Sequence, residues 1–318
     1  MTLDADSIAA RRRLRRSLSF WRVAAILAAG LAILALVLAV GGEGFKRRAD
    51  HIARVRVEGL ITGDRPFLKM LEKLEKADRV KAVIIDIDSP GGTTAGSEAI
   101  YEAIRKIAAK KPVVSVMGTI AASGGYITAI ASDYIVARGN TITGSIGVIF
   151  QWAQLQKLLD SLGVQMQEVK SGELKAEPNF FKPPSEKALA VANGMIQDSF
   201  HWFTGLVTER RHLPPDRVLV LSDGRVYTGR QALQEKLIDA LGGEDQALDW
   251  LRKEKKIPES LKVVNWKPDD ESSAFGLGLV KSMLGLDRAG FASLLLNAKD
   301  AFDVARLDGL LSVWQARP

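Results

Sequence analysis

A serine between small residues follows an apolar segment in the first half of the chain. Ser123 stands within the motif AASGGY, residues 121–126, and the segment VVSVM before it predicts a strand. A serine where a strand turns into a helix lifts its hydroxyl clear of the backbone, and small neighbours let a carbonyl group approach it. The motif therefore fits a nucleophile. Taken alone it fits a helix N-cap equally well, because serine is a preferred capping residue.

Two glycines end a second motif that could stabilise negative charge. The motif DSPGG, residues 88–92, follows the apolar segment AVIIDI, and a helix pattern begins after it. Backbone N–H groups at such a junction suit an oxyanion, although an ordinary tight turn explains such a motif more often. Gly92 and Ser123 are 31 residues apart, so neighbouring strands of one parallel sheet would bring the donors and the hydroxyl together. Acyl transfer needs that combination.

The serine hydroxyl needs a base, and histidine is scarce. The chain has three histidines, His51, His201 and His212, and none lies at a strand or helix end near the serine in sequence. A histidine-based triad is therefore disfavoured, and lysine is the alternative base. Free lysine titrates near 10.4, so a lysine base working near neutral pH needs its pKa lowered by about three units through desolvation.

Two lysine candidates lie in one segment. The stretch VKSGELKAEPNFF, residues 169–181, holds Lys170 and Lys175 among apolar side chains that could exclude water from an amine. Lys175 follows Leu174 and precedes two phenylalanines, but the residues alone leave the choice between Lys175 and Lys170 open. The ordinary explanation for either residue is a solvated lysine in a loop, because lysines are rarely buried.

Five motifs resemble a known family in both sequence and order. DSPGG and AASGGY are followed by TGSIGV (residues 143–148), KSGELKAEP (170–178) and DGRVYTGRQA (223–232). Together they are similar to the motifs of the signal peptide peptidase A (SppA) family, over roughly residues 52–255. The resemblance implies a fold related to the Clp protease and crotonase families, and hydrolysis of peptide bonds by a Ser–Lys dyad.

The resemblance also implies roles for single residues. Ser123 resembles the nucleophile of the family and Lys175 its general base. Ser145 resembles the hydroxyl that orients the lysine amine. The backbone N–H groups of Gly92 and Gly124 resemble the oxyanion hole. No metal and no cofactor are implied.

The chain carries only one copy of these motifs, as the short members of the family do. The resemblance implies a homo-oligomeric ring or bowl in which active sites are shared, because a neighbouring subunit supplies the lysine. Leu174 departs from the aromatic residue or histidine that many members carry beside the lysine.

Alternating strand and helix patterns are expected to position these motifs. The predicted strands are Ala53–Val57, Lys81–Asp86, Pro112–Met117, Tyr134–Ala137 and Val164–Val169. The predicted helices are Phe67–Lys76, Ala95–Ala108, Gly125–Ala131, Trp152–Leu162 and Ser185–Arg211. Strands separated by helices predict an α/β fold with largely parallel pairing. Together with the family resemblance, this indicates stacked ββα units of the Clp protease/crotonase type.

The amino-terminal region resembles a membrane anchor. Residues 23–40, VAAILAAGLAILALVLAV, are uncharged and would span about 27 Å as a helix, close to the hydrocarbon core of a bilayer. The basic cluster before them outnumbers the one after them, so the N-terminus is predicted in the cytoplasm and the rest outside the cytoplasmic membrane of a bacterium. A cleaved signal peptide is the alternative, with a weak cleavage site at Ala39-Val40-Gly41.

Charge and composition exclude other classes of function. Residues 1–48 hold nine basic and three acidic residues, whereas the remaining 270 hold 35 basic and 34 acidic ones, so the net charge of +7 does not indicate a nucleic-acid surface. The absence of cysteine excludes disulfides and thiolate chemistry. The expected organisation is a basic N-terminus (1–22), a transmembrane helix (23–40), a linker (41–51), a protease domain (52–268) and an amphipathic tail (269–318).

The sequence therefore predicts a membrane-anchored serine endopeptidase that degrades remnant signal peptides and similar apolar peptides. Its expected partners are peptide substrates, the lipid bilayer and further copies of itself. Two alternatives stay open at this point. A crotonase-type acyl-CoA enzyme would share the sheet and the oxyanion hole but fits poorly with an exported domain. A non-catalytic peptide-binding or scaffold protein at the membrane would need no dyad.

Overall fold

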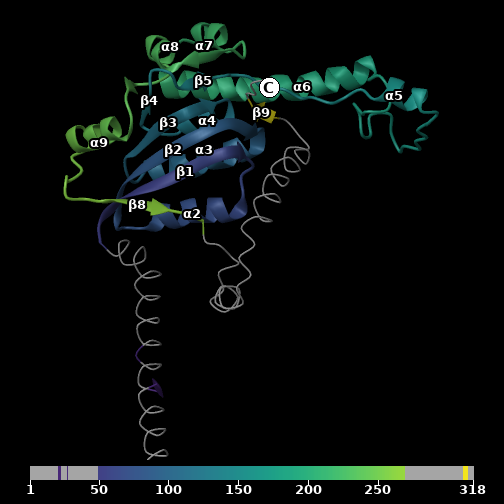
Figure 1. The fold of residues 1–318 in the computed structure, drawn as a ribbon. Coiled ribbons are helices and arrows are strands. Elements are labelled where there is room, and N and C mark those ends of the chain that lie inside the picture. The colour runs from purple at the N-terminus through teal and green to yellow at the C-terminus, as the bar shows by residue number, and fades with distance from the viewer. Residues whose placement is uncertain (1–20, 23–26, 28–48, 269–310, 314–318) are drawn as a thin grey trace, which may run out of the picture. The chain divides into compact units, whose positions relative to one another are not determined.

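The computed structural model describes residues 21–22, 27, 49–268 and 311–313 (Figure 1). The chain divides into two units, residues 1–51 and 52–318. Of the predicted membrane segment 23–40, only Leu27 lies within the described residues. Among the residues that the structure describes, no helix combines the length and the apolar composition needed to cross a bilayer.

The described residues form a nine-stranded, mostly parallel sheet (Figure 1). The central order is β6-β5-β3-β2-β1-β8, with β4 and β7 continuing beside β3, and β9 paired with β2. Among the strand pairs whose register the structure describes, only β5–β6 and β2–β9 are antiparallel. The strands are β1 (His51–Ile61), β2 (Val80–Thr93), β3 (Val113–Ala122), β4 (Tyr134–Ala137), β5 (Ile142–Gly144), β6 (Val226–Thr228), β7 (Ala240–Leu241), β8 (Val263–Trp266) and β9 (Leu311–Val313).

Apolar side chains alternate between the two faces of the sheet, and both faces are covered. In β2, Ile85 points into a large core that includes residues of α2, α3, α4 and α6, whereas Ile84 packs against α9 on the other face. A parallel strand buried on both sides reads as a continuous apolar run, which explains the sequence AVII. The helices are α2 (Arg65–Lys76), α3 (Thr94–Ala108), α4 (Gly124–Ile130), α5 (Gln156–Ser161), α6 (Glu186–Arg211), α7 (Pro215–Leu221), α8 (Gly229–Gln234) and α9 (Glu244–Lys253).

Most predicted elements are confirmed, and the mixed α/β class is correct. The prediction of a strand at Val164–Val169 is wrong, because that segment has no strand partner within the described residues and its side chains are exposed. The helix predicted at Trp152–Leu162 is reduced to the short α5. The DSPGG motif is not a turn after β2 but part of it, because pairing with β3 resumes at Ser89 beyond an irregularity at Ile87.

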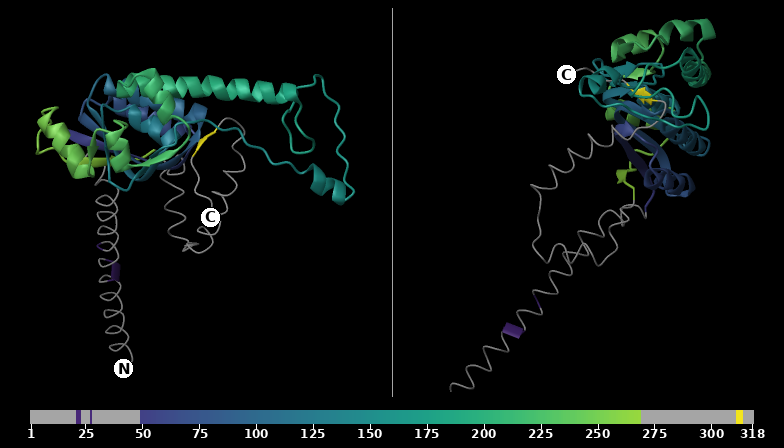
Figure 2. Two further views of the ribbon diagram at one scale, coloured as in Figure 1. Left: turned by 90° about the horizontal axis from the view of Figure 1, so that it is seen from above. Right: turned by 90° about the vertical axis from the view of Figure 1, so that its right-hand side faces the viewer.

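Helix α6 extends away from the sheet, and the segment that connects β5 to α6 is held away from the sheet with it. Its 26 residues make a rod about 39 Å long. Near its carboxyl end, Phe203 and Val207 are fully buried, and the Arg210 guanidinium donates to the carbonyls of Ile130 (3.0 Å) and Ser132 (3.1 Å) after α4. Most side chains of its first half, such as Leu189 and Val191, are exposed, although Ala188 and Ala192 are buried. Within residues 52–318, α5 and residues around it lie at the far end of α6 from α4 (Figures 1 and 2).

Candidate active site

Ser123 links the end of β3 to the start of α4 in a strained backbone conformation. Its φ of 56° and ψ of −115° lie outside the regions that residues with a side chain prefer. Its side chain makes no capping hydrogen bond to α4, so the N-cap interpretation of this serine is not supported. The residue is 1% exposed, and its N–H donates to the Gly144 carbonyl at 2.8 Å. Strain at a strand-to-helix turn is typical of a nucleophilic serine.

The two glycines predicted to form an oxyanion hole lie against each other. A Cβ atom on Gly124 would lie 3.1 Å from the nitrogen of Gly92, so their backbones are close neighbours. A Cβ atom on Gly92 would lie only 1.9 Å from the Ile61 carbonyl oxygen, which excludes any side chain there. The N–H of Ser123 donates to the Gly144 carbonyl, so it is not available to an oxyanion, and the N–H groups of Gly92 and Gly124 stay the predicted donors.

Ser145 is brought next to Ser123 by strand pairing. Strand β5 runs parallel to β3 with Gly144 opposite Ala122, so the residues after both strands are neighbours. Ser145 also has a positive φ, 49°, and is 7% exposed. Its N–H donates to the Arg225 carbonyl at 2.8 Å, which fixes the turn. The structure therefore gathers Ser123, Ser145 and the two glycines at one end of the sheet.

Three further side chains hold this end of the sheet, and the sequence analysis did not assign them a role. The Ser89 hydroxyl donates to the Gly59 carbonyl (2.6 Å) and accepts from the N–H of Gly91 (3.1 Å), which ties β2 to β1. The Asp88 carboxylate accepts from the N–H of Ile120 (3.1 Å). The Thr143 hydroxyl donates to the Ala121 carbonyl (2.7 Å). The presence of Asp88 and Ser89 inside the DSPGG motif was the available signal.

Lys175 does not join this group within one subunit. It lies in the segment between α5 and α6, is exposed, and has no ion pair among the described residues. Within residues 155–188, the side-chain hydrogen bonds and ion pairs that the structure describes stay inside this segment. The segment lies at the far end of α6 from the β3–α4 junction (Figure 2). We call residues 149–187 the arm.

Lys170, the second candidate base, is held as a cation. Its ammonium lies 2.8 Å from a carboxylate oxygen of Glu168 and 2.8 Å from one of Glu177. The hydrogen bonds that the ammonium donates to Glu168 and then to Glu177 raise the pKa of Lys170, which is the wrong direction for a base. Glu177, whose side chain is 4% exposed, also pairs with Lys182 at 2.7 Å. The hydrogen bond from Lys170 is the main cause that lowers the pKa of Glu177.

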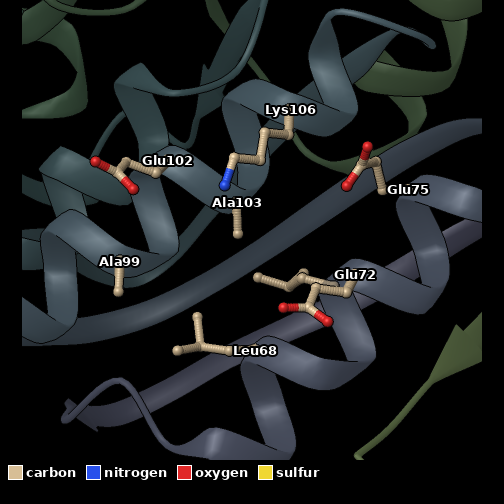
Figure 3. A pocket seen from close by; sticks show the side chains of 8 residues that line it. Leu68, Glu72, Glu75, Ala99, Glu102, Ala103 and Lys106 are labelled. Atoms are coloured by element: carbon tan, nitrogen blue, oxygen red, sulfur yellow. The ribbon is translucent and has the colours of Figure 1, made fainter.

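The histidines lie apart from the site. His212 ends α6 in the left-handed conformation, His201 is exposed on α6, and His51 begins β1 at the opposite end from Ile61. Within the described part of the chain, no cluster of acidic or histidine side chains could hold a metal. A cavity of about 200 Å³ lies between α2 and α3, and none of the candidate residues lines it (Figure 3). Its lining residues are Leu68, Leu71, Glu72, Glu75, Ala99, Glu102, Ala103 and Lys106.

Comparison with known proteins identifies the family. The family model of peptidase family S49 matches residues 105–258, and that of Clp protease matches residues 64–139. A putative protease of Synechocystis sp. is 37% identical over 201 residues, which are 63% of this chain and 72% of that protein. A putative protease of Methanocaldococcus jannaschii is 32% identical over 213 residues, 67% of this chain and 68% of that protein.

Two more matches complete the comparison. A putative signal peptide peptidase SppA of Enterococcus faecium is 35% identical over 237 residues, 74% of this chain and 66% of that protein. A solved structure of a Clp protease subunit variant from Listeria monocytogenes has a TM-score of 0.43 and 18% identity, and it covers 61% of this chain and 94% of its own. From the family-model match and these relatives, we conclude that the chain belongs to peptidase family S49.

Proposed function

We propose that this protein is a membrane-tethered, homo-oligomeric serine endopeptidase with a Ser–Lys dyad. Ser123 is the nucleophile, and Lys175 of a neighbouring subunit is the general base. The observation that carries the proposal is the position of Ser123, strained at the β3–α4 junction beside the backbones of Gly92 and Gly124. Membership of a peptidase family supports hydrolysis over acyl-CoA chemistry or a purely structural role.

The proposed reaction uses groups of the chain alone. The uncharged amine of Lys175 takes the proton of the Ser123 hydroxyl while the oxygen attacks the scissile carbonyl carbon. The N–H groups of Gly92 and Gly124 bind the oxyanion that forms. The lysine ammonium then gives its proton to the leaving amine as the C–N bond breaks. Water, deprotonated by the same amine, then attacks the acyl carbon. The ester bond to Ser123 Oγ breaks, the ammonium returns its proton to that oxygen, and the new carboxylic acid leaves.

The shape of the arm supports a lysine supplied in trans. In one subunit the arm carries Lys175 away from the serine, and its exposed apolar side chains suit contact with another copy; they include Leu155, Leu158, Val169 and Phe180. Ala176, next to the lysine, has a φ of 57°, and such strain is common at functional positions. Ser145 would receive the amine and orient it toward Ser123. The resulting assembly would consist of Clp protease-like stacked ββα units.

The proposed substrates are remnant signal peptides and similar apolar peptides leaving the membrane. Residues 23–40 are the proposed anchor, with the N-terminus in the cytoplasm and the catalytic unit on the other side of a bacterial cytoplasmic membrane. The short linker 41–51 would keep the site close to the bilayer. The name of the Enterococcus faecium relative, a putative signal peptide peptidase, agrees with this substrate class.

A serine-directed probe tests the proposal. A fluorophosphonate applied to the detergent-solubilised chain should label Ser123, and Ser123→Ala should lower peptide cleavage by about a thousandfold or more while leaving the fold intact. Ser260→Ala, which removes an exposed hydroxyl elsewhere, is the matched control and should behave as wild type. Undiminished cleavage by the Ser123→Ala chain, or labelling at a different residue, would refute the proposed nucleophile.

A further inference from the structure

Positive charge is concentrated at the end of the sheet opposite the candidate site. The amino ends of β1 and β8 meet there, with Ile52 opposite Val263, as do those of β2 and β3, with Val83 opposite Val113. Helices α2, α3 and α9 run back from the carboxyl ends of the strands, so their last turns lie at the same end. Ser123 follows the carboxyl end of β3, one strand length away.

The charge at this end differs from that of the rest of the folded unit. Residues 76–81, 106–112, 131–134 and 252–262 together hold eleven basic and four acidic residues. All other residues of 49–268 hold 19 basic and 23 acidic ones, so a unit that is nearly neutral as a whole is strongly uneven. We call the exposed cations of these segments the basic end; they are Lys76, Arg79, Lys81, Lys106, Lys110, Lys253, Lys255, Lys256 and Lys262.

Helix stability explains only part of this charge. Cations in the last turn of a helix are favoured by its dipole, which accounts for Lys76, Lys106 and Lys253. Lys256 and Lys262 lie beyond α9, and neither has an ion pair among the residues that the structure describes. Neighbouring like charges repel each other and lower stability. A surplus of exposed cations that the helices do not require therefore indicates an anionic partner.

Aromatic side chains at the same end suit a membrane interface. Tyr134, the first residue of β4, stacks on Trp250 of α9 with ring centroids 4.8 Å apart and planes 8° apart. The ammonium of Lys255 lies 5.2 Å from the centre of the Trp250 ring. Both rings are half-buried. Tyrosine and tryptophan gather at the headgroup level of membrane proteins, because each combines an apolar body with a polar tip.

The chain connects this end directly to the proposed anchor. The N–H of Ile52 donates to the Lys262 carbonyl at 3.0 Å, and residues 41–51 link Ile52 to the apolar segment 23–40. We propose that the basic end binds the anionic lipid headgroups of the membrane that holds the anchor. This inference rests on the proposed membrane tether. Each lysine or arginine near an anionic surface strengthens the attraction about fivefold, so the cluster would fix the orientation of the unit on the bilayer.

Binding in this orientation would affect which peptides reach the serine. Strand β1 has eleven residues and is about 36 Å long. Because the candidate site lies at the carboxyl end of the strands, it would face away from the headgroups. Peptides that lie wholly within the bilayer would then escape cleavage, whereas peptides that extend out of it would be cleaved.

The chain has no cysteine, so an introduced thiol can carry a fluorescence donor at either end of the sheet. Full-length chains with Ser260→Cys, beside the basic end, or Thr62→Cys, after β1, are placed in phosphatidylcholine nanodiscs that contain an acceptor lipid. Added phosphatidylglycerol should raise energy transfer from residue 260 about twofold but not from residue 62, and about 0.5 M salt should remove the gain by screening. Equal transfer from residue 260 with and without phosphatidylglycerol would overturn the proposal.

Charge variants test whether the basic end is the binding surface. Lys256→Glu combined with Lys262→Glu should weaken the attraction about 25-fold or more and abolish the gain in transfer. Arginine at both positions keeps the charge and should keep the gain. Arg65→Glu combined with Lys236→Glu makes the same change in charge at exposed positions elsewhere and should behave as wild type. A gain that survives the first pair of substitutions would refute the basic end.

Vesicle flotation separates this inference from the proposed tether. An anchored full-length chain floats with pure phosphatidylcholine vesicles whether or not Lys256 and Lys262 are replaced by glutamate. If wild type floats only with vesicles that contain phosphatidylglycerol, and the glutamate variant does not, the tether fails and the basic end is supported. Wild type that floats with neither kind of vesicle would refute both.

Discussion

Left-handed backbone conformations mark three residues of the proposed chemistry. Ser123, Ser145 and Ala176 have φ values of 56°, 49° and 57°. For residues other than glycine such conformations cost on the order of 1–3 kcal/mol each, and they persist only where surrounding structure enforces them. Strand pairing enforces the first two, through β3 and β5. The third lies in the arm, where a network of charged side chains provides the constraint.

Glu177 is the centre of that network. Its nearly buried carboxylate pairs with Lys170 and Lys182 and accepts from the Asn179 amide. A carboxylate with this many partners fixes the conformation of the loop around Lys175. We regard Glu177 as a positioning residue, since it contacts no reacting atom in the proposed mechanism.

Acid should loosen the arm through Glu177. Because the pKa of Glu177 is lowered from its usual value of 4.5, the stability that its ion pairs give is fully present above about pH 4.5 and is lost as the pH falls through the lowered value. The protection factors of the amide hydrogens in residues 165–182, which correct for the slower intrinsic exchange in acid, should therefore fall on acidification. Glu177→Gln should show low protection factors already at pH 7 and lose most of their pH dependence. A variant with wild-type protection at pH 7 would show that the network does not constrain the arm.

At the scale of elements, the contact between β1 and β2 sets how closely Gly92, a proposed oxyanion donor, approaches the backbone of β1. Gly92 lies against the Ile61 carbonyl with no room for a methyl group. In contrast, Gly194 stands in the exposed first half of α6, and a Cβ atom there would meet nothing within 4 Å. The two glycines make a matched pair, because one is required by packing and the other is not.

Substitution by alanine should have opposite effects at these two positions. Gly92→Ala should destabilise the chain by about 2 kcal/mol or more, because backbone has to move to admit the methyl group. Gly194→Ala should stabilise α6 by about 0.5–1 kcal/mol, because alanine restricts the unfolded chain and favours helix. Urea unfolding measures both. A Gly92→Ala chain as stable as wild type would show that the β1–β2 approach is looser than described.

Elements with strong local patterns could be predicted from the sequence, whereas segments whose conformation depends on strand pairing could not. The apolar run of β2 and the helix patterns of α3 and α6 are local, and they were predicted. The continuation of β2 through Gly91 and Gly92 depends on partners distant in sequence, and Pro-Gly-Gly reads locally as a turn. The segment Val164–Val169 has the composition of a strand but no neighbour to pair with among the described residues, so composition alone misled.

The candidate site shows the same division. Ser123, Ser145 and both glycines were identified from motifs, and the strands bring them together. The position of Lys175, beyond the amino-terminal end of α6, could not be predicted from local patterns. It depends on how α6 is anchored: Phe203 and Arg210 hold its second half, whereas most side chains of its first half are exposed. The partners of Lys170 were equally hidden, since they lie on the folded arm.

For the whole molecule, the proposed dyad would leave a single subunit without a complete site, because the arm holds Lys175 away from Ser123. Its charged network, short helix and exposed apolar side chains make it a projecting element whose proposed partner is another copy. The closed ring implied by such head-to-tail contacts would give each serine one lysine from its neighbour. Activity would then depend on assembly.

Mixed assemblies test whether the site is shared. Chains with Ser123→Ala and chains with Lys175→Ala, each inactive alone, should regain about a quarter of wild-type activity when co-assembled at equal amounts, because random neighbours complete that share of sites. Ser123→Ala mixed with wild type is the calibration and should give about half. Two different affinity tags isolate the mixed assemblies. If the mixture stays as inactive as its parents, the lysine acts within its own subunit or not at all.

The end of β2 also sets what can be digested. Residues 91–93 include two glycines and offer mainly backbone, so a substrate paired with this edge would be recognised through its main chain rather than through particular side chains. In folded proteins most backbone N–H and C=O groups are already hydrogen-bonded, so no extended segment is available to pair with β2. The protease would therefore select substrates by their conformation. Peptide fragments and unfolded polypeptides would be cleaved, whereas folded proteins in the same compartment would not be cleaved unless another factor unfolded them.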